Sequence, residues 1–205
     1  LSLGVKRANG FNMKHLFLTL LVTLVCVGCQ KEAPLASKVD TVEDTIFDSP
    51  IPDVTKAKAV AAKDELFKQL SDRLMEVMKS EGPASAINVC SKEASQLATN
   101  VGEQLGVKIG RTALKLRNTN NAVPEWAENL ASADAVDPQF VHIDAQTAGA
   151  LLPIKLQQKC LICHGEQALL ATDIKEQLAA LYPADQATGF KDGDLRGWFW
   201  VEVPK

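Results

Sequence analysis

Two cysteines and a histidine stand within five consecutive positions, at Cys160, Cys163 and His164, in a chain that has only five cysteines. A C-x-x-C-H pattern is compatible with covalent haem attachment, with zinc binding, or with a dithiol that cycles with a disulfide. Each alternative ties this stretch to a cofactor or to a redox task. The motif therefore constrains the possible folds and functions more than any other segment does.

A short apolar run near the N-terminus predicts export. Residues 16–28 carry no charge and follow Lys14 and His15, which is the arrangement of a secretory signal. These thirteen residues are too few to span a bilayer, which takes about 20 apolar residues. Residues 1–12 are interpreted as a translation-start artefact or a tolerated extension.

The apolar run ends in Val-Gly-Cys29-Gln30, which resembles a bacterial lipobox. In that interpretation Cys29 becomes the lipidated N-terminus, and Gln30 favours the outer membrane of a Gram-negative envelope. The alternative is an ordinary signal peptide that is cut nearby and releases a soluble periplasmic protein. Both alternatives place the mature chain in the periplasm.

The sequence predicts three parts: a leader (1–28), a flexible tether rich in Pro, Ser, Thr and acids (29–55), and one domain (56–205). The leader holds three of the 22 basic residues and none of the 25 acidic ones, so the remainder carries a formal net charge of −6. Nucleic acid is therefore excluded as an expected partner.

Within the domain, two helices are expected at about 56–80 and 84–105, separated by Gly82-Pro83. The second helix places Cys90 on its buried face. Alternation then predicts strands at 107–116 (with a bulge near Gly110), 139–144, 149–157 (with a turn around Gly149) and 195–203, with short helices from Pro124 and from 173. Helices followed by antiparallel strands indicate an α+β domain.

The export signal favours haem for the C-x-x-C-H motif. Two thiols at this spacing can each add to a vinyl group of the porphyrin, with the adjacent His164 beneath the iron. Zinc could draw on Cys90 as a fourth ligand, but structural sites seldom use adjacent ligands such as Cys163 and His164. A dithiol leaves His164 without a role, and the surrounding pattern is not a βαβ unit.

The spacing of residues alone does not identify the second axial ligand of the iron. Cys90 is left over after the other cysteines are assigned, and an unpaired cysteine in an oxidising compartment is either buried as a small apolar residue or a ligand. Met75 and Met78 in the first helix and His142 in a strand are the other candidates. Core packing is the simpler role for the methionines.

Four segments together resemble a c-type haem family long catalogued as a domain of unknown function: "SAINVCSKEA", "RTALKLRNTNN…PEW", "LPIKLQQKCLICHG" and "LYPADQATGFKDGDLRGWFWV". Members have a PAS-like fold and occur alone or as the extracytoplasmic part of sensor histidine kinases. The resemblance implies an antiparallel sheet flanked by N-terminal helices and one covalently attached haem c.

The resemblance also implies roles for individual residues. Cys160 and Cys163 would be the attachment sites, with His164 and the thiolate of Cys90 as the axial ligands. Arg111 and Arg117, with Asn118 beside them, match the family's "RT…K.RN" segment and would contact the haem propionates or fix the haem-side loop.

The expected function is redox or diatomic-gas sensing by a thiolate-ligated haem, with a small electron-transfer cytochrome as the alternative. No acid–base constellation stands beside the motif, so the chain is not expected to be an enzyme. No kinase or cyclase segment follows residue 205, so signalling would pass to a separate redox or signalling partner in the envelope. Membrane attachment would come from the lipid on Cys29.

Overall fold

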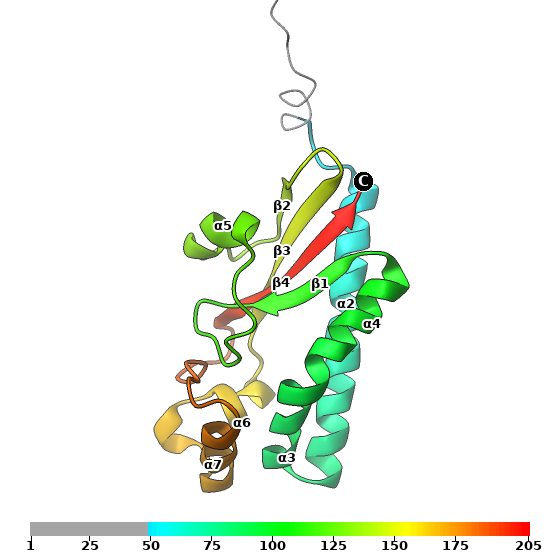
Figure 1. Cartoon of the computed structure of the whole chain (residues 1–205). Helices are drawn as coiled ribbons and strands as arrows, with labels where there is room; N and C mark the ends of the chain where they lie inside the picture. The colour runs from blue at the N-terminus through cyan, green and yellow to red at the C-terminus, as the bar shows by residue number, and fades with distance from the viewer. Residues whose placement is uncertain (1–48) are drawn as a thin grey trace, which may run out of the picture. The chain divides into compact units, whose positions relative to one another are not determined.

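A long N-terminal helix runs along one side of the molecule in the computed structural model, which describes residues 49–205 (Figure 1). This helix, α2, spans Asp53–Ser80. It begins three residues earlier than predicted, directly after Pro52, so the end of the predicted tether is helical. Its buried stripe repeats at three- and four-residue steps through Ala59, Ala62, Leu66 and Leu70, and returns two turns later at Val77.

The second predicted helix is helical over its whole length but is not α-helical throughout. It consists of α3 (Pro83–Asn88), the five-residue π-helical turn η1 (Val89–Glu93) and α4 (Ala94–Leu105). Gly82 lies before α3 with φ of 93°, and Gly106 ends α4 in the left-handed region, as glycine allows. Cys90 lies within the π-helical turn, a form of helix that is rare and frequently found at functional sites.

Four strands form one antiparallel sheet in the order β1-β4-β3-β2. Their bounds are β1 (Lys108–Thr112), β2 (Gln139–His142), β3 (Thr147–Lys155) and β4 (Leu195–Pro204). The predicted α+β class is confirmed. The likeness to a PAS fold stays a prediction.

Two strand predictions were wrong, and contacts with tryptophan rings explain why Gly110 makes no bulge and Gly149 no turn. The first strand ends at Thr112 and has no bulge at Gly110, which pairs regularly with Trp200. A Cβ on Gly110 would lie 2.5 Å from the Trp200 ring, so the glycine makes room for an indole. Gly149 likewise lies inside β3 against Trp126, and the β2–β3 connection falls at 143–146 instead.

Both faces of the sheet are covered, which explains the apolar closing strand. Phe199, Val201 and Val203 of β4 pack with α2 and α4 in one core. On the other face Trp198 packs against Ala127 and Ala131, in η2 (Glu125–Ala127) and α5 (Glu128–Ser132). The Trp198 indole donates to the carbonyl of Ala135 over 2.7 Å. The predicted short helix after Pro124 is confirmed.

The motif lies in a group of short helices at one end of the sheet, beside α3 (Figure 1). They are η3 (Gln158–Cys160), α6 (Leu161–His164), η4 (Gln167–Leu169) and α7 (Thr172–Leu181). Ile174 and Leu178 of α7 pack against Ile87 of α3, which brings the motif opposite the π-helical turn. Within residues 49–205, the structure contains no helix with the length and apolar character needed to cross a bilayer.

Candidate haem site

A cavity of about 230 Å³ separates the motif from the N-terminal helices. A single water needs only about 10–15 Å³, so this space suits a much larger occupant. Every residue that the sequence analysis assigned to cofactor binding lines it: Cys90, Arg111, Arg117, Cys160, Cys163 and His164. The structure thus brings together residues that lie up to 74 positions apart in the chain.

One side of the cavity, here called the motif wall, is built from residues 160–165 and 185–190. Gly165 N donates to Leu161 O over 2.8 Å and closes the four-residue helix. A Cβ on Gly165 would lie 2.6 Å from that same oxygen, so the tight return after His164 needs glycine. Two further backbone bonds join the segments, from Gly189 N to Gly165 O and from Phe190 N to His164 O.

The imidazole of His164 is held in one tautomer. Its Nδ1 lies 2.7 Å from Ala187 O, and because a carbonyl can only accept, Nδ1 carries the proton. Nε2 is left as the nitrogen with a free lone pair. Burial and then the nearby charge of Arg117 lower the pKa of His164 well below its usual value. A neutral imidazole with its second nitrogen anchored is the form that binds metals.

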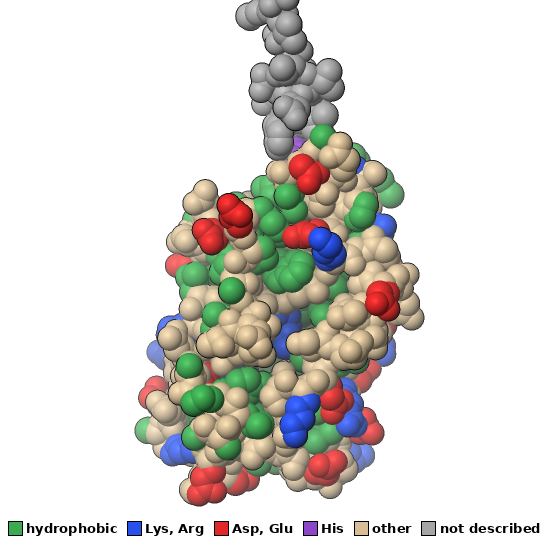
Figure 2. Space-filling view, viewed as in Figure 1, with side chains coloured by type: hydrophobic (Ala, Val, Ile, Leu, Met, Phe, Trp, Pro, Cys, Tyr) green, Lys and Arg blue, Asp and Glu red, His purple; other side chains and the backbone are tan. Residues whose placement is uncertain are grey.

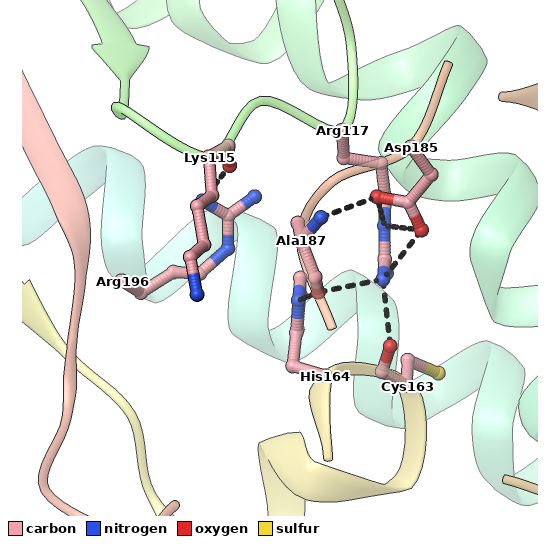
Figure 3. A network of polar contacts seen from close by, with 7 residues as sticks. All are labelled: Lys115, Arg117, Cys163, His164, Asp185, Ala187 and Arg196. Atoms are coloured by element: carbon pink, nitrogen blue, oxygen red, sulfur yellow. Dashed lines mark hydrogen bonds and ion pairs between the residues drawn. The ribbon is translucent and has the colours of Figure 1, made fainter. Parts of the chain in front are cut away.

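Arg117 is buried and holds the motif wall together (Figure 3). Its Nε lies 3.2 and 3.1 Å from the carboxylate oxygens of Asp185. Its Nη2 donates to Cys163 O over 2.6 Å and to Ala187 O over 3.0 Å. Of the two roles that the resemblance left open, these contacts support fixing the loop.

Positive charge faces the cavity from two further arginines. Arg111 at β1 was predicted, whereas Arg196 at the start of β4 was missed although it stands in the quoted closing segment. Arg196 donates to Lys115 O over 3.0 Å and lies over the Phe190 ring. Burial, and then the charges of Arg117 and Arg111, lower its pKa to about 10. An anionic group in the cavity would relieve this repulsion.

The opposite side, here called the helix wall, is formed by α2, α3 and η1. It carries three sulfur-bearing side chains, Met75, Met78 and Cys90, all of which line the cavity. Cys90 is half-buried, not fully buried as its place on the helix predicted. Among the described residues, none forms a hydrogen bond with the Cys90 sulfur, in contrast to the His164 imidazole, which is bonded to Ala187 O.

Tyr182 joins the two walls and was also missed by the sequence analysis. It lines the cavity, and it packs in one cluster with Ile87 of the helix wall and Cys163 of the motif wall. Burial, and then the nearby Cys90, raise its pKa to about 12. Burial likewise raises the pKa of the Cys163 thiol to about 11, so both groups are neutral near pH 7.

The zinc and dithiol alternatives find little support in the geometry. Within residues 49–205, no three His, Cys, Asp or Glu side chains are placed to share one metal ion. This finding weighs against a zinc site, which needs four ligands. It does not weigh against haem, because haem iron needs only two protein ligands, one on each face of the ring. A thioredoxin-like dithiol is expected in a βαβ setting, whereas every strand pairing among the described residues is antiparallel.

One candidate for the second axial ligand lies elsewhere. His142 is on β2, outside the cavity, where Nε2 lies 2.8 Å from Ser49 O and Nδ1 lies 2.6 Å from Lys205 Nζ. It is therefore not a candidate axial ligand. Cys29, the leader and most of the tether lie outside the described residues.

Comparison with known proteins places the chain in a family. The Tll0287-like family model matches residues 52–204. The crystal structure of the cyanobacterial heme-protein Tll0287 superposes with a TM-score of 0.54 at 24% sequence identity, covering 76% of this chain and 98% of that chain. No curated protein matches. The match confirms the resemblance found in the sequence, and this chain belongs to the Tll0287-like family.

Proposed function

We propose that the cavity holds one haem c, attached through thioethers at Cys160 and Cys163 and ligated by His164 Nε2 and Cys90 Sγ. The observation that carries this proposal is the meeting of two motif thiols, a neutral imidazole anchored through Nδ1, and a third thiol on the wall opposite. The solved relative is described as a heme-protein, which supports the same cofactor.

The rest of the cavity suits an amphipathic ring with two carboxylates. Apolar side chains supply surfaces on which the macrocycle would pack: Phe67, Leu70, Leu74, Ile154, Leu156 and Phe199. Arg111 and Arg196 would hold the propionates, whose negative charge would offset the repulsion between the two guanidinium groups. Arg117 is already paired with Asp185, so its part would be to fix the loop.

When bound, haem supplies a one-electron redox centre and an iron coordination site. The chain would hold one of its two axial ligands more firmly than the other. His164 is fixed by Ala187 and the backbone of residues 189–190, whereas Cys90 stands in a π-helical turn without a hydrogen bond from the described residues. Cys90 would therefore be the ligand that leaves, opening a position for a small molecule.

We infer that the protein is a redox or diatomic-gas sensor, not an enzyme. A small electron-transfer cytochrome is the second candidate, favoured by the presence of both His164 and Cys90 in the cavity lining, which could fill both axial positions of the iron. If both stayed bound in both oxidation states, no position would open. The two candidate functions thus differ in whether the bond between Cys90 Sγ and the iron breaks when the oxidation state changes.

The proposed location is the periplasm of a Gram-negative bacterium, with lipid on Cys29 anchoring the chain to the outer membrane. A tether from residue 30 to Pro52 would let the domain meet a redox or signalling partner in the envelope. Nucleic acid is not a proposed partner. Acidic, basic and apolar side chains are mixed over the face shown in Figure 2, and no basic patch gathers on it.

Carbon monoxide titration of the reduced holoprotein tests the proposal. Sensing predicts that carbon monoxide binds readily and that the thiolate signature of the ferric spectrum is lost on reduction. An unchanged six-coordinate low-spin spectrum with fast, reversible electron exchange would favour electron transfer. Cys90→Ala should shift the ferric Soret and near-infrared charge-transfer bands, and unchanged bands would remove Cys90 from the iron.

A further inference from the structure

The carbonyl oxygen of Ala187 accepts from two donors at once, and one of them is the His164 imidazole (Figure 3). His164 Nδ1 lies 2.7 Å from this oxygen and Arg117 Nη2 lies 3.0 Å from it. Ala187 is fully buried, so bulk water does not compete for the carbonyl. The hydrogen bond of the imidazole is therefore coupled to a guanidinium group.

The guanidinium is in turn held by Asp185. Arg117 Nη2 lies 3.1 Å from Asp185 Oδ2, and the two side chains are only 7% and 11% exposed. Asp185 Oδ1 also accepts from Ala187 N over 2.8 Å. Asp185, Arg117 and Ala187 thus form a buried ring of hydrogen bonds, and the Ala187 carbonyl connects this ring to His164.

Polarisation in this network acts on the imidazole. A ligating imidazole becomes a better electron donor when its other N–H is drawn toward a strong acceptor. A carbonyl that already accepts from a cation is a weaker acceptor, so Arg117 reduces the donor strength of His164. The charge of Arg117 also disfavours the more positive oxidation state of an iron nearby, which acts in the same direction. Asp185 offsets both effects.

We propose that Arg117 and Asp185 are positioning residues that set the donor strength of His164 through the Ala187 carbonyl, and with it the reduction potential of the haem iron. This inference rests on the proposed haem site. The pair acts in opposite senses: Arg117 raises the potential and Asp185 lowers it. A merely structural pair would behave differently, because breaking it from either side would loosen the same loop and shift the potential in the same direction.

The test is a spectroelectrochemical titration of the holoprotein and its variants Arg117→Gln, Asp185→Asn and the double variant. Arg117→Gln should favour the ferric form about tenfold, a fall of about 59 mV for a one-electron couple. Asp185→Asn should favour the ferrous form by a similar factor, and the double variant should return to within about threefold of the original equilibrium. Lys108→Gln is the matched control and should leave the potential unchanged, because the exposed Lys108 pairs with Glu202 outside the cavity lining.

A second readout follows the hydrogen bond itself. In the ferrous protein saturated with carbon monoxide, where the iron is low-spin and diamagnetic, the proton resonance of His164 Nδ1–H should move downfield in Arg117→Gln and upfield in Asp185→Asn. If one variant does not fold, the direction of the potential shift in the other variant still tests the inference. Shifts of the two potentials in the same direction, or no shift, would overturn the inference.

Covalent haem on a denaturing gel separates the two ways to fail. A wild-type chain without covalent haem would overturn the proposed function. If the wild-type chain carries covalent haem but the reduction potentials of the two variants do not shift in opposite directions, only the proposed tuning by Arg117 and Asp185 is overturned.

Discussion

The two walls of the cavity are built in contrasting ways. The motif wall is cross-linked by a buried ion pair, by side-chain bonds to the Cys163 and Ala187 carbonyls, and by backbone bonds between residues 164–165 and 189–190. The helix wall presents Cys90 from a π-helical turn, which is backed by apolar packing of Val89 and by a partly exposed ion pair between Glu93 of the turn and Arg73 of α2. If His164 and Cys90 ligate a haem iron as proposed, this contrast would favour ligand exchange on the Cys90 side, which a sensor requires.

The largest expected difference between the walls concerns covalent attachment. Replacing Cys160 and Cys163 together with Ala should abolish the haem stain on a denaturing gel, because no thioether can form. Cys90→Ala should keep the stain, because that thiol would contact the iron only. Loss of the stain in Cys90→Ala, or its survival in the double variant, would reverse the assigned roles of the two walls.

The second difference concerns stability without haem. Arg117→Ala should lower the free energy of unfolding by about 3–5 kcal/mol, because it leaves Asp185 as an unpaired buried charge. Cys90→Ala should cost about 1 kcal/mol, as for an ordinary substitution. Urea unfolding of the chain expressed without haem measures both. Equal losses would mean that the motif wall is no more tightly held than the helix wall.

A smaller effect tests the tight turn of the motif wall. Gly165→Ala should cost about 1–3 kcal/mol, because the added methyl would meet Leu161 O at 2.6 Å and the loop must shift. The same urea experiment measures it, and the yield of covalent haem should fall with it. An unchanged free energy of unfolding would show that the turn opens without cost.

The smallest effect concerns Tyr182, which bridges the walls. The pKa of its phenol is raised to about 12, against about 10 in an unfolded chain. Between these values the unfolded chain loses the proton first, so the free energy of unfolding falls as pH rises. In Tyr182→Phe, the free energy of unfolding should fall by about 1–2 kcal/mol less over this pH range than in the original protein. Identical pH profiles for the two proteins would place the phenol in solvent.

The sequence predicted the helices and the α+β class, because periodic apolar positions are local signals. The residues that it assigned to cofactor binding, some from the C-x-x-C-H spacing and some from the family resemblance, all line one cavity. It did not predict the regular pairing at Gly110, because the reason for that glycine is Trp200, ninety positions away. The π-helical turn at Cys90 was missed since its residues keep an ordinary helical pattern.

The parts of the site that the sequence did not supply are long-range polar contacts. Arg117 reaches Asp185 across 68 positions and the Ala187 carbonyl across 70. A carbonyl leaves no trace in side-chain patterns, so the anchor of His164 had no signal of its own. The resemblance named Arg117, but only the fold shows that it holds the loop.

The most direct test of the account is the intact mass of the full chain, made in a host that matures c-type cytochromes and then denatured. The account predicts the mass of the polypeptide plus one haem, with the addition mapping to the peptide that contains Cys160 and Cys163. A mass without haem, from protein that is colourless or carries zinc, would contradict it.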